Sequence, residues 1–397
     1  MICGAPTSYS DRSLEPLETW GRIKPLLPRL GVTRLSRLTG LDRIGIPVWN
    51  AVTPNAKSIV ISQGKGIADI DAKVSAAMEA IERVVAGSPL TPVVTLTRAE
   101  LRASGFAHLC LNELLSPGAC ELADNEMINW VEADDLLQNR PCFLPHQAVS
   151  LDRTLEAPRF WQSSDGLASG NTRLEAALHG LLERVERDAY TLWQLSPLKL
   201  RCRVDPAILR DEIVDGLVEK ISTAGFVIRL FDMTTDLGIS CFTALLAPMD
   251  FRERRELKMA EVNMGSGAHP NAVRAAIRAI TEAAQSRMTF LSGARDDILD
   301  VVFTQACPQD TRASLDIEIG SGMREPQLVL GDVETLLQWV LTQLRTAGIS
   351  QVAVADLSCN HLPVHVVKVV VPELENPYGH RKQRFGPRAL LQAMAGA

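Results

Sequence analysis

Three segments of the chain repeat one arrangement of polar and apolar positions. Residues spaced i, i+4 and i+7 share one face of an α-helix, so each segment predicts a helix with a polar stripe beside an apolar one. The polar stripes are Ser75, Glu79 and Glu82, then His179, Glu183 and Glu186, and then Arg278, Glu282 and Gln285. We expect the second helix over 173–194 and the third over 270–291.

The carboxylates of these stripes border positions that face the core. A partly buried carboxylate is costly unless a cation compensates its charge. Arg83 and Arg187 directly follow two of the stripes and supply part of that charge. An ordinary alternative is a set of solvated helix faces held by ion pairs along each helix. Three aligned copies instead favour a site for hard cations, and Mg²⁺ bound to a polyphosphate is the commonest such ligand.

Strands and further helices alternate around these three segments. Strands are expected near 46–52, 58–62, 126–131, 142–149, 226–231, 239–247, 351–356 and 364–371, and other helices near 98–104, 132–138, 209–224 and 332–347. This order predicts an α/β fold with mixed sheets. Residues 1–30 contain four prolines and form a lead-in with at most one short helix, and 31–397 form a single large domain without an internal linker.

Two glycine-containing turns precede the first two helices. Gly64-Lys65-Gly66 lacks the spacing of a phosphate-binding P-loop, which needs an earlier glycine and a hydroxyl residue after the lysine. What remains is a turn that offers the ammonium group of Lys65 to an anion, or a plain turn with a solvated lysine. The second turn, 166–172, leads into a helix that Thr172 or Asn171 caps, and Asn171 and Glu175 extend its polar stripe.

Composition limits the class of protein. The 397 residues are 46% hydrophobic and carry a net charge of −6, which argues against a general nucleic-acid binder. No apolar run reaches membrane-spanning length, and no signal sequence is apparent. The eight cysteines are scattered singly, as in a cytoplasmic protein with reduced thiols. The spacing of Cys359, His361 and His365 matches no standard zinc site.

Taken in order, the motifs resemble those of the YcaO superfamily. The resemblance covers residues from about 31 to the C-terminal end. Residues 31–50, 265–269 and 293–297 look most like the TfuA-associated branch of that superfamily. The resemblance rests on the order Ser62-Gln63-Gly64-Lys65-Gly66, Ser75-x-x-x-Glu79-x-x-Glu82-Arg83, Gly166-Leu167-Ala168-Ser169-Gly170-Asn171-Thr172, Glu183-x-x-Glu186-Arg187-Asp188 and Glu282-x-x-Gln285-x-Arg287.

The resemblance implies an enzyme that uses ATP and Mg²⁺ to modify peptide backbone amides. Carried over by position, the residues implied to bind ATP are Lys65, Ser75, Glu79, Glu82, Asn171, Glu175, Glu183, Glu186, Arg187, Glu282, Gln285 and Arg287. Glu79, Glu82, Glu183 and Glu186 are the implied Mg²⁺ ligands. No residue is assigned as a general base, because the pose of the peptide is unknown.

In this family a nucleophile adds to the amide carbon, ATP phosphorylates the oxygen, and phosphate leaves. An external sulfide gives a thioamide, whereas a neighbouring Cys, Ser or Thr side chain gives an azoline. Azoline-forming members typically end in Pro-x-Pro-x-Pro, and this chain does not. The resemblance therefore favours thioamidation of a peptide or protein with a TfuA-like sulfur-delivery partner. It also implies a possible homodimer, and the short lead-in implies a separate leader-peptide-binding protein. Azoline formation and non-catalytic nucleotide binding are the alternatives.

Overall fold

Three β-sheets surround the three motif-bearing helices in the computed structural model, which describes residues 9–109, 111–295, 297–320, 325–358, 362–376 and 385–396. The motif-bearing helices are α2 (Asp69–Gly87), α5 (Arg173–Leu195) and α7 (Ala272–Ser292). The prediction of these helices is confirmed to within a few residues. Thr172 caps α5, because its hydroxyl accepts a hydrogen bond from the Glu175 N–H at 3.1 Å.

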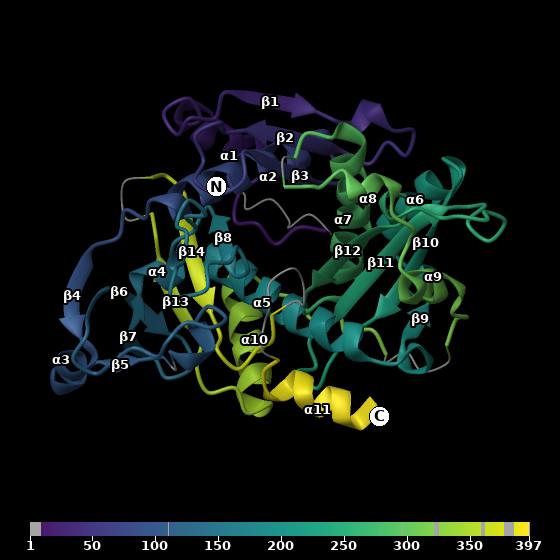
Figure 1. The fold of residues 1–397 in the computed structure, drawn as a ribbon. Helices are drawn as coiled ribbons and strands as arrows, with labels where there is room; N and C mark the ends of the chain where they lie inside the picture. Colours follow the sequence, from purple (N-terminus) through teal and green to yellow (C-terminus); the bar gives the residue numbers. More distant parts are fainter. Residues whose placement is uncertain are drawn as a thin grey trace.

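The first sheet has three antiparallel strands and lies at the top of Figure 1. Its order is β1 (Arg34–Arg37), β2 (Val48–Val52) and β3 (Ile61–Lys65). The second sheet has four antiparallel strands on the right of the same view. Its order is β12 (Asn263–Ala268), β11 (Cys241–Pro248), β10 (Phe226–Asp232) and β9 (Cys202–Val204).

The third sheet has seven strands and lies on the left of Figure 1. Its order is β5 (Ala107–His108), β7 (Arg140–Pro145), β6 (Met127–Asp135), β13 (Ala353–Asp356), β14 (His365–Val370) and β8 (Leu167–Gly170), with β4 (Val93–Thr97) also paired to β6. Only the pair β5–β7 is parallel among the described strands. The predicted mixed α/β architecture is therefore correct.

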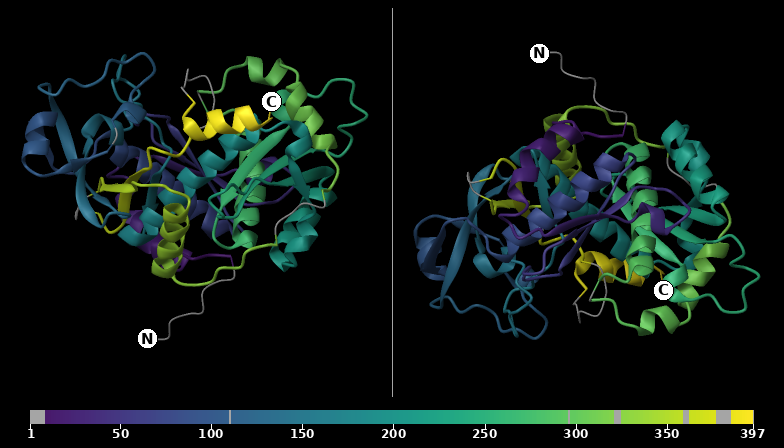
Figure 2. Two further views of the ribbon diagram at one scale, coloured as in Figure 1. Left: turned by 90° about the horizontal axis from the view of Figure 1, so that it is seen from below. Right: turned by 90° about the horizontal axis from the view of Figure 1, so that it is seen from above.

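The remaining helices lie around these sheets and the motif helices (Figure 2). They are α1 (Pro16–Ile23), α3 (Arg98–Ala103), α4 (His146–Val149), α6 (Glu212–Thr223), α8 (Val301–Thr304), α9 (Gln309–Asp316), α10 (Val333–Thr346) and α11 (Pro387–Gly396). Helix α1 packs on α2, α10 and α11 pack on α5, and α6 packs on β10. In the described part of the chain, no helix combines the length and the apolar character needed to cross a membrane.

One predicted helix is wrong. Residues 132–138 were expected to be helical, but 132–135 continue strand β6 and a turn follows. Along this strand Val131, Ala133 and Asp135 are buried while Glu132 and Asp134 are exposed. That alternation with a period of two is the pattern of a half-buried strand, and it was present in the sequence.

The apolar stripes predicted for the motif helices form the core. On α5 the residues Leu178, Leu182, Val185 and Ala189 are all at most 1% exposed. Together with α10 and the inner face of the four-stranded sheet they belong to one apolar cluster. Burial of this stripe fixes the rotation of α5 about its axis, and this rotation sets the direction of the neighbouring polar stripe.

Candidate functional site

The three motif helices and the strands that precede them form a closed ring. Helix α2 follows β3 and packs on both β3 and β8, helix α5 follows β8 and packs on β8 and β12, and helix α7 follows β12 and packs on β12 and β3. Each helix therefore contacts its own strand and the strand of the next unit. This arrangement brings polar stripes that are far apart in the sequence to one place.

Glycines allow the close approach of strand and helix in this ring. A Cβ atom on Gly64 would lie 2.0 Å from the backbone nitrogen of Ala76 on α2. A Cβ atom on Gly265 would lie 2.1 Å from the backbone nitrogen of Ala283 on α7. No side chain fits at these distances, so the two crossings require glycine.

The first carboxylate of each stripe accepts a hydrogen bond from a backbone N–H at or near its own strand. Glu79 accepts from the N–H of Gln63 at 3.1 Å. Glu183 accepts from the N–H of Gly166 at 3.2 Å, and Glu282 accepts from that of Ser266. These bonds hold the three side chains in equivalent orientations.

The last polar residue of two stripes contacts the strand of the next unit. Glu82 accepts hydrogen bonds from the Ser169 N–H at 2.9 Å and from the Ser169 hydroxyl at 2.6 Å. Gln285 donates through Nε2 to the carbonyl oxygen of Gln63 at 2.9 Å. The ring is therefore closed by polar contacts as well as by packing.

Three cations neutralise part of the acidic cluster, which we define as Glu79, Glu82, Glu183, Glu186 and Glu282. Arg83 forms an ion pair with Glu79 at 2.7 Å. Lys65 on β3 forms an ion pair with Glu282 at 2.6 Å. Arg187 lies near three carboxylates, Glu183 at 3.3 Å, Glu186 at 3.6 Å and Asp165 at 3.6 Å. Its buried Nε atom has no hydrogen-bond partner in the described structure.

The acidic cluster is partly buried, and this perturbs its ionisation. Burial raises the pKa of Glu82 to about 8, and the charges of Glu79 and Glu183 add to the effect. Burial also raises the pKa values of Glu183 and Glu186. Burial opposes ionisation of Glu282 too, but Lys65 and Arg187 outweigh it and lower the pKa of that carboxyl. Uncompensated carboxylates of this kind are typical of functional sites.

The donors present suit a metal–polyphosphate ligand. The side chains of Glu79, Glu183 and Glu186 keep 27%, 27% and 11% of their surface exposed, so a ligand can reach them. Among the described residues no three His, Cys, Asp or Glu side chains already form a complete metal cage. Mg²⁺ rarely needs one, because it is usually held by one or two carboxylates together with phosphate oxygens and water. Arg187 and Lys65 lie beside these carboxylates and add positive charge at the same place.

Asn171 and Glu175 lie beside this cluster, in contact with the N-terminal segment. Glu175 is 1% exposed and accepts from Arg12 at 2.8 Å and from the Ser13 N–H and hydroxyl. Although burial opposes it, the Arg12 guanidinium lowers the pKa of Glu175. Asn171 accepts from the Thr19 hydroxyl at 3.0 Å.

The sequence pattern does not predict the contacts that the N-terminal segment makes with the site. Asp11 is also inserted here, facing His269 at 3.5 Å and Arg278 at 3.7 Å. Burial opposes ionisation of Asp11, yet these partners hold its pKa well below the usual value. A proline-containing lead-in carries no periodicity, so no pattern could have revealed that 11–13 reach the site.

Two residues that were predicted to belong to the site have surroundings other than the acidic cluster. Ser75 is exposed one turn before Glu79 and has no described hydrogen bond to the cluster. Arg287 donates to Asp42 at 2.6 Å and stacks on Phe226 at 4.3 Å. Because Arg287 lies five residues after Glu282, it leaves the face that carries the polar stripe.

The other weighed sites do not form a metal centre in the described structure. His365 contacts Asp356 at 3.1 Å on the paired strands β13 and β14. Cys359 and His361 lie outside the described residues. The described cysteines 120, 142, 202, 241 and 307 form no disulfide with one another.

Comparison with known proteins identifies the family. A sequence model of the YcaO cyclodehydratase family, described as binding ATP and Mg²⁺, matches residues 63–375. The chain belongs to the YcaO family. An uncharacterised protein encoded in the tfuA 3′ region of Rhizobium leguminosarum bv. trifolii is 38% identical over 393 residues, covering 97% of this chain and 93% of that protein. The relationship to the TfuA-associated branch is therefore confirmed.

Solved structures share the fold. A YcaO protein from Methanopyrus kandleri bound with AMPPCP and Mg²⁺ superposes with a TM-score of 0.69 at 23% identity, covering 92% of both chains. A heterocyclase in complex with substrate and cofactor gives a TM-score of 0.75 at 22% identity, with 95% of this chain covered. The chain spans 55% of the length of that heterocyclase. This YcaO protein is thus an ATP-dependent enzyme with a domain that binds ATP and Mg²⁺.

Proposed function

We propose that this YcaO enzyme activates a peptide backbone amide by O-phosphorylation and that sulfide then replaces the oxygen, giving a thioamide. The observation that carries the proposal is the convergence of Glu79, Glu82, Glu183, Glu186 and Glu282 around Arg187 and Lys65. The relative encoded beside tfuA supports sulfur transfer in particular.

In this proposal the twelve residues inferred from the sequence differ in how directly they contact the nucleotide and its Mg²⁺. Glu79, Glu82, Glu183 and Glu186 hold Mg²⁺, while Arg187 and Lys65 neutralise phosphate oxygens. Bound there, ATP supplies the phosphoryl group that converts an amide oxygen into a leaving group. Asn171, Glu175, Glu282 and Gln285 hold the walls of the site through the contacts described above. Ser75 is accessible to the nucleotide, whereas Arg287 acts only by supporting α7.

The reaction balances without a redox partner. Sulfide adds to the amide carbon, the resulting oxyanion takes the phosphoryl group, and phosphate departs with the original oxygen as the thiocarbonyl forms. A TfuA-like protein would deliver the sulfur, and a separate leader-peptide-binding protein would recognise the substrate. In the alternative, a Cys, Ser or Thr side chain attacks the same carbon and an azoline results. The description of the family as cyclodehydratases favours this alternative.

Intact-mass analysis of a peptide encoded near the gene tests the proposal. The peptide is incubated with the protein, its TfuA-like partner, ATP, Mg²⁺ and sulfide. A gain of about 16 Da, oxygen exchanged for sulfur, is the expected result. A loss of about 18 Da would establish azoline formation instead. ATP binding without hydrolysis, over a panel of such peptides, would favour a nucleotide-binding role without catalysis.

A further inference from the structure

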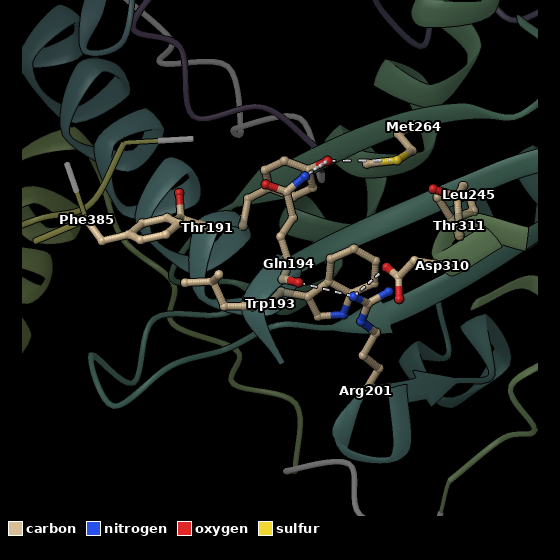
Figure 3. Close-up of a pocket in the computed structure, with 11 residues that line it drawn as sticks. Thr191, Trp193, Gln194, Arg201, Leu245, Met264, Asp310, Thr311 and Phe385 are labelled. Carbon is tan, nitrogen blue, oxygen red and sulfur yellow. Dashed lines mark hydrogen bonds and ion pairs between the residues drawn. The ribbon is translucent and has the colours of Figure 1, made fainter. Parts of the chain in front are cut away.

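A cavity of about 250 Å³ opens beside the C-terminal part of α5 (Figure 3). We call it the α5 cavity. Helix α5, strands β11 and β12, and the first turn of α9 contribute its walls, and Arg201 lines it from the segment after α5. Its principal side chains are Tyr190, Trp193, Arg201, Leu245, Met264 and Asp310.

The α5 cavity adjoins the acidic cluster. Tyr190 follows Glu186 by four residues on α5, which is about one helical turn, or roughly 5.4 Å along the axis. On the other wall, the carbonyl oxygen of Met264 accepts from the hydroxyl of Ser286 at 2.6 Å, and Ser286 follows Glu282 by one turn on α7. Two walls of the cavity therefore continue directly from elements that carry the carboxylates.

Aromatic rings make up much of its surface. The rings of Tyr190 and Trp193 stack with centroids 6.1 Å apart and an interplanar angle of 20°. The Arg201 guanidinium lies over the Trp193 ring at 4.3 Å. Flat apolar surfaces of this kind bind an apolar or aromatic side chain without immobilising flexible groups.

The charges on the cavity wall compensate each other. Among the described lining residues, Arg201 and Asp310 are the only charged ones, and they form an ion pair at 2.7 Å. A charged ligand side chain would lose its hydration here without gaining a free counter-charge, which is unfavourable. The cavity therefore selects against charge.

Two buried donors on the wall lack acceptors. The indole Nε1–H of Trp193 and the Nε–H of Arg201 are both buried and make no hydrogen bond in the described structure. Their residues are 8% and 5% exposed. A buried donor without a partner costs about 1–3 kcal/mol, and neither atom is open to a ligand in this conformation.

We propose that the α5 cavity binds one uncharged, apolar side chain of the peptide substrate, next to the amide that is activated. This inference rests on the proposed function for the identity of the ligand as a peptide. The volume is below that of sites for drug-sized molecules, which start at about 300 Å³, and so it suits a single side chain with its adjoining peptide group. The residue that occupies it determines which amide reaches the acidic cluster.

The test uses a minimal peptide unit and needs no turnover. Saturation-transfer NMR measures the binding of N-acetyl-L-phenylalanine N-methylamide to the full chain. AMPPCP and Mg²⁺ are present in the sample. N-acetyl-L-glutamate N-methylamide is the charged comparison. We expect the phenylalanine derivative to bind with a dissociation constant of about 1 mM and the glutamate derivative to bind at least about tenfold more weakly.

Two substitutions that fill the cavity locate the binding. Thr311→Trp places an indole at a half-buried lining position, and Gln194→Trp does so at an exposed lining position where the core is not disturbed. Each should weaken the phenylalanine derivative about tenfold or more. Thr342→Trp, at an exposed position on α10 outside the lining, is the control and should leave binding unchanged.

Several results would overturn the inference. They are no binding of the phenylalanine derivative up to about 20 mM, equal binding of the glutamate derivative, or full binding in both filled variants. Thioamide formed at an undiminished rate by both filled variants would also overturn it while leaving the proposed function intact. Conversely, cavity binding without any thioamide or azoline product would reject the proposed function alone.

Discussion

Lys65 Nζ lies 2.6 Å from the Glu282 carboxylate, although 217 positions separate the two residues. This pair joins the first strand–helix unit of the ring to the third. Together with Arg187, Lys65 lowers the pKa of Glu282, while burial raises the pKa of Glu82, Glu183 and Glu186. These two cations thus set the charge state of one corner of the acidic cluster.

Replacing this lysine should weaken nucleotide binding more than it destabilises the fold. Lys65→Met removes the cation that meets phosphate and should reduce the affinity for AMPPCP–Mg²⁺ about fivefold to tenfold, measured by isothermal titration calorimetry. The ion pair is 25% exposed on both sides, so the melting temperature should change little. Lys65→Arg keeps the charge and is the matched control. Equal affinity in Lys65→Met and wild type would remove Lys65 from the site.

Nucleotide binding should strengthen as the pH rises. Burial raises the pKa of Glu82 to about 8, so this carboxyl is largely protonated at neutral pH, and a metal ion must displace the proton. Between pH 6.5 and 8.5 we expect the affinity for AMPPCP–Mg²⁺ to increase in both proteins. The increase should be about ten times larger in wild type than in Glu82→Gln. Comparing the two proteins cancels the titration of the nucleotide itself. Glu219→Gln, at an exposed position on α6, is the control and should show the same change of affinity with pH as wild type. An equal change of affinity with pH in wild type and Glu82→Gln would contradict the role of Glu82.

Arg12 in the N-terminal segment should contribute to stability through its ion pair with the buried Glu175. Arg12→Ala leaves Glu175 with Ser13 and Asn171 as partners but without a counter-charge. Because Arg12 is 40% exposed, we expect a loss of only about 1 kcal/mol in the free energy of unfolding, measured by urea denaturation. The exposed Arg22→Ala on α1 serves as control. Identical midpoints for these two variants would mean that the Arg12 contact does not stabilise the fold.

The glycines at the strand–helix crossings should tolerate no side chain. Gly64→Ala and Gly265→Ala each place a Cβ within about 2 Å of helix backbone, which must move. We expect a loss of about 3 kcal/mol or more in the free energy of unfolding for each, together with weaker nucleotide binding. Gly216→Ala on α6 meets nothing within 4 Å and should instead stabilise the protein by about 0.5–1 kcal/mol. Thermal melts of the three variants measure these changes in stability. A Gly64→Ala variant as stable as wild type would contradict the close approach of β3 to the backbone of α2.

The sequence predicted the motif helices because their polar and apolar stripes repeat with helical spacing. That periodicity also indicated which carboxylates would meet, because equivalent positions on equivalent helices point the same way once the apolar stripes are buried. It could not predict the closed ring, since the pairing of β3, β8 and β12 with neighbouring helices is a long-range property. The insertion of Asp11 and Arg12, and the departure of Arg287 toward Asp42, likewise depend on tertiary contacts that no local pattern records.

The most direct test of the account is calorimetric titration of AMPPCP into wild type and into the double variant Glu183→Ala/Glu186→Ala, each with and without Mg²⁺. Wild type should bind the nucleotide tightly only with Mg²⁺, and the double variant should lose at least about a hundredfold in affinity while keeping its circular dichroism spectrum. Unchanged, Mg²⁺-dependent binding in the folded double variant would show that the ring of carboxylates is not the nucleotide site.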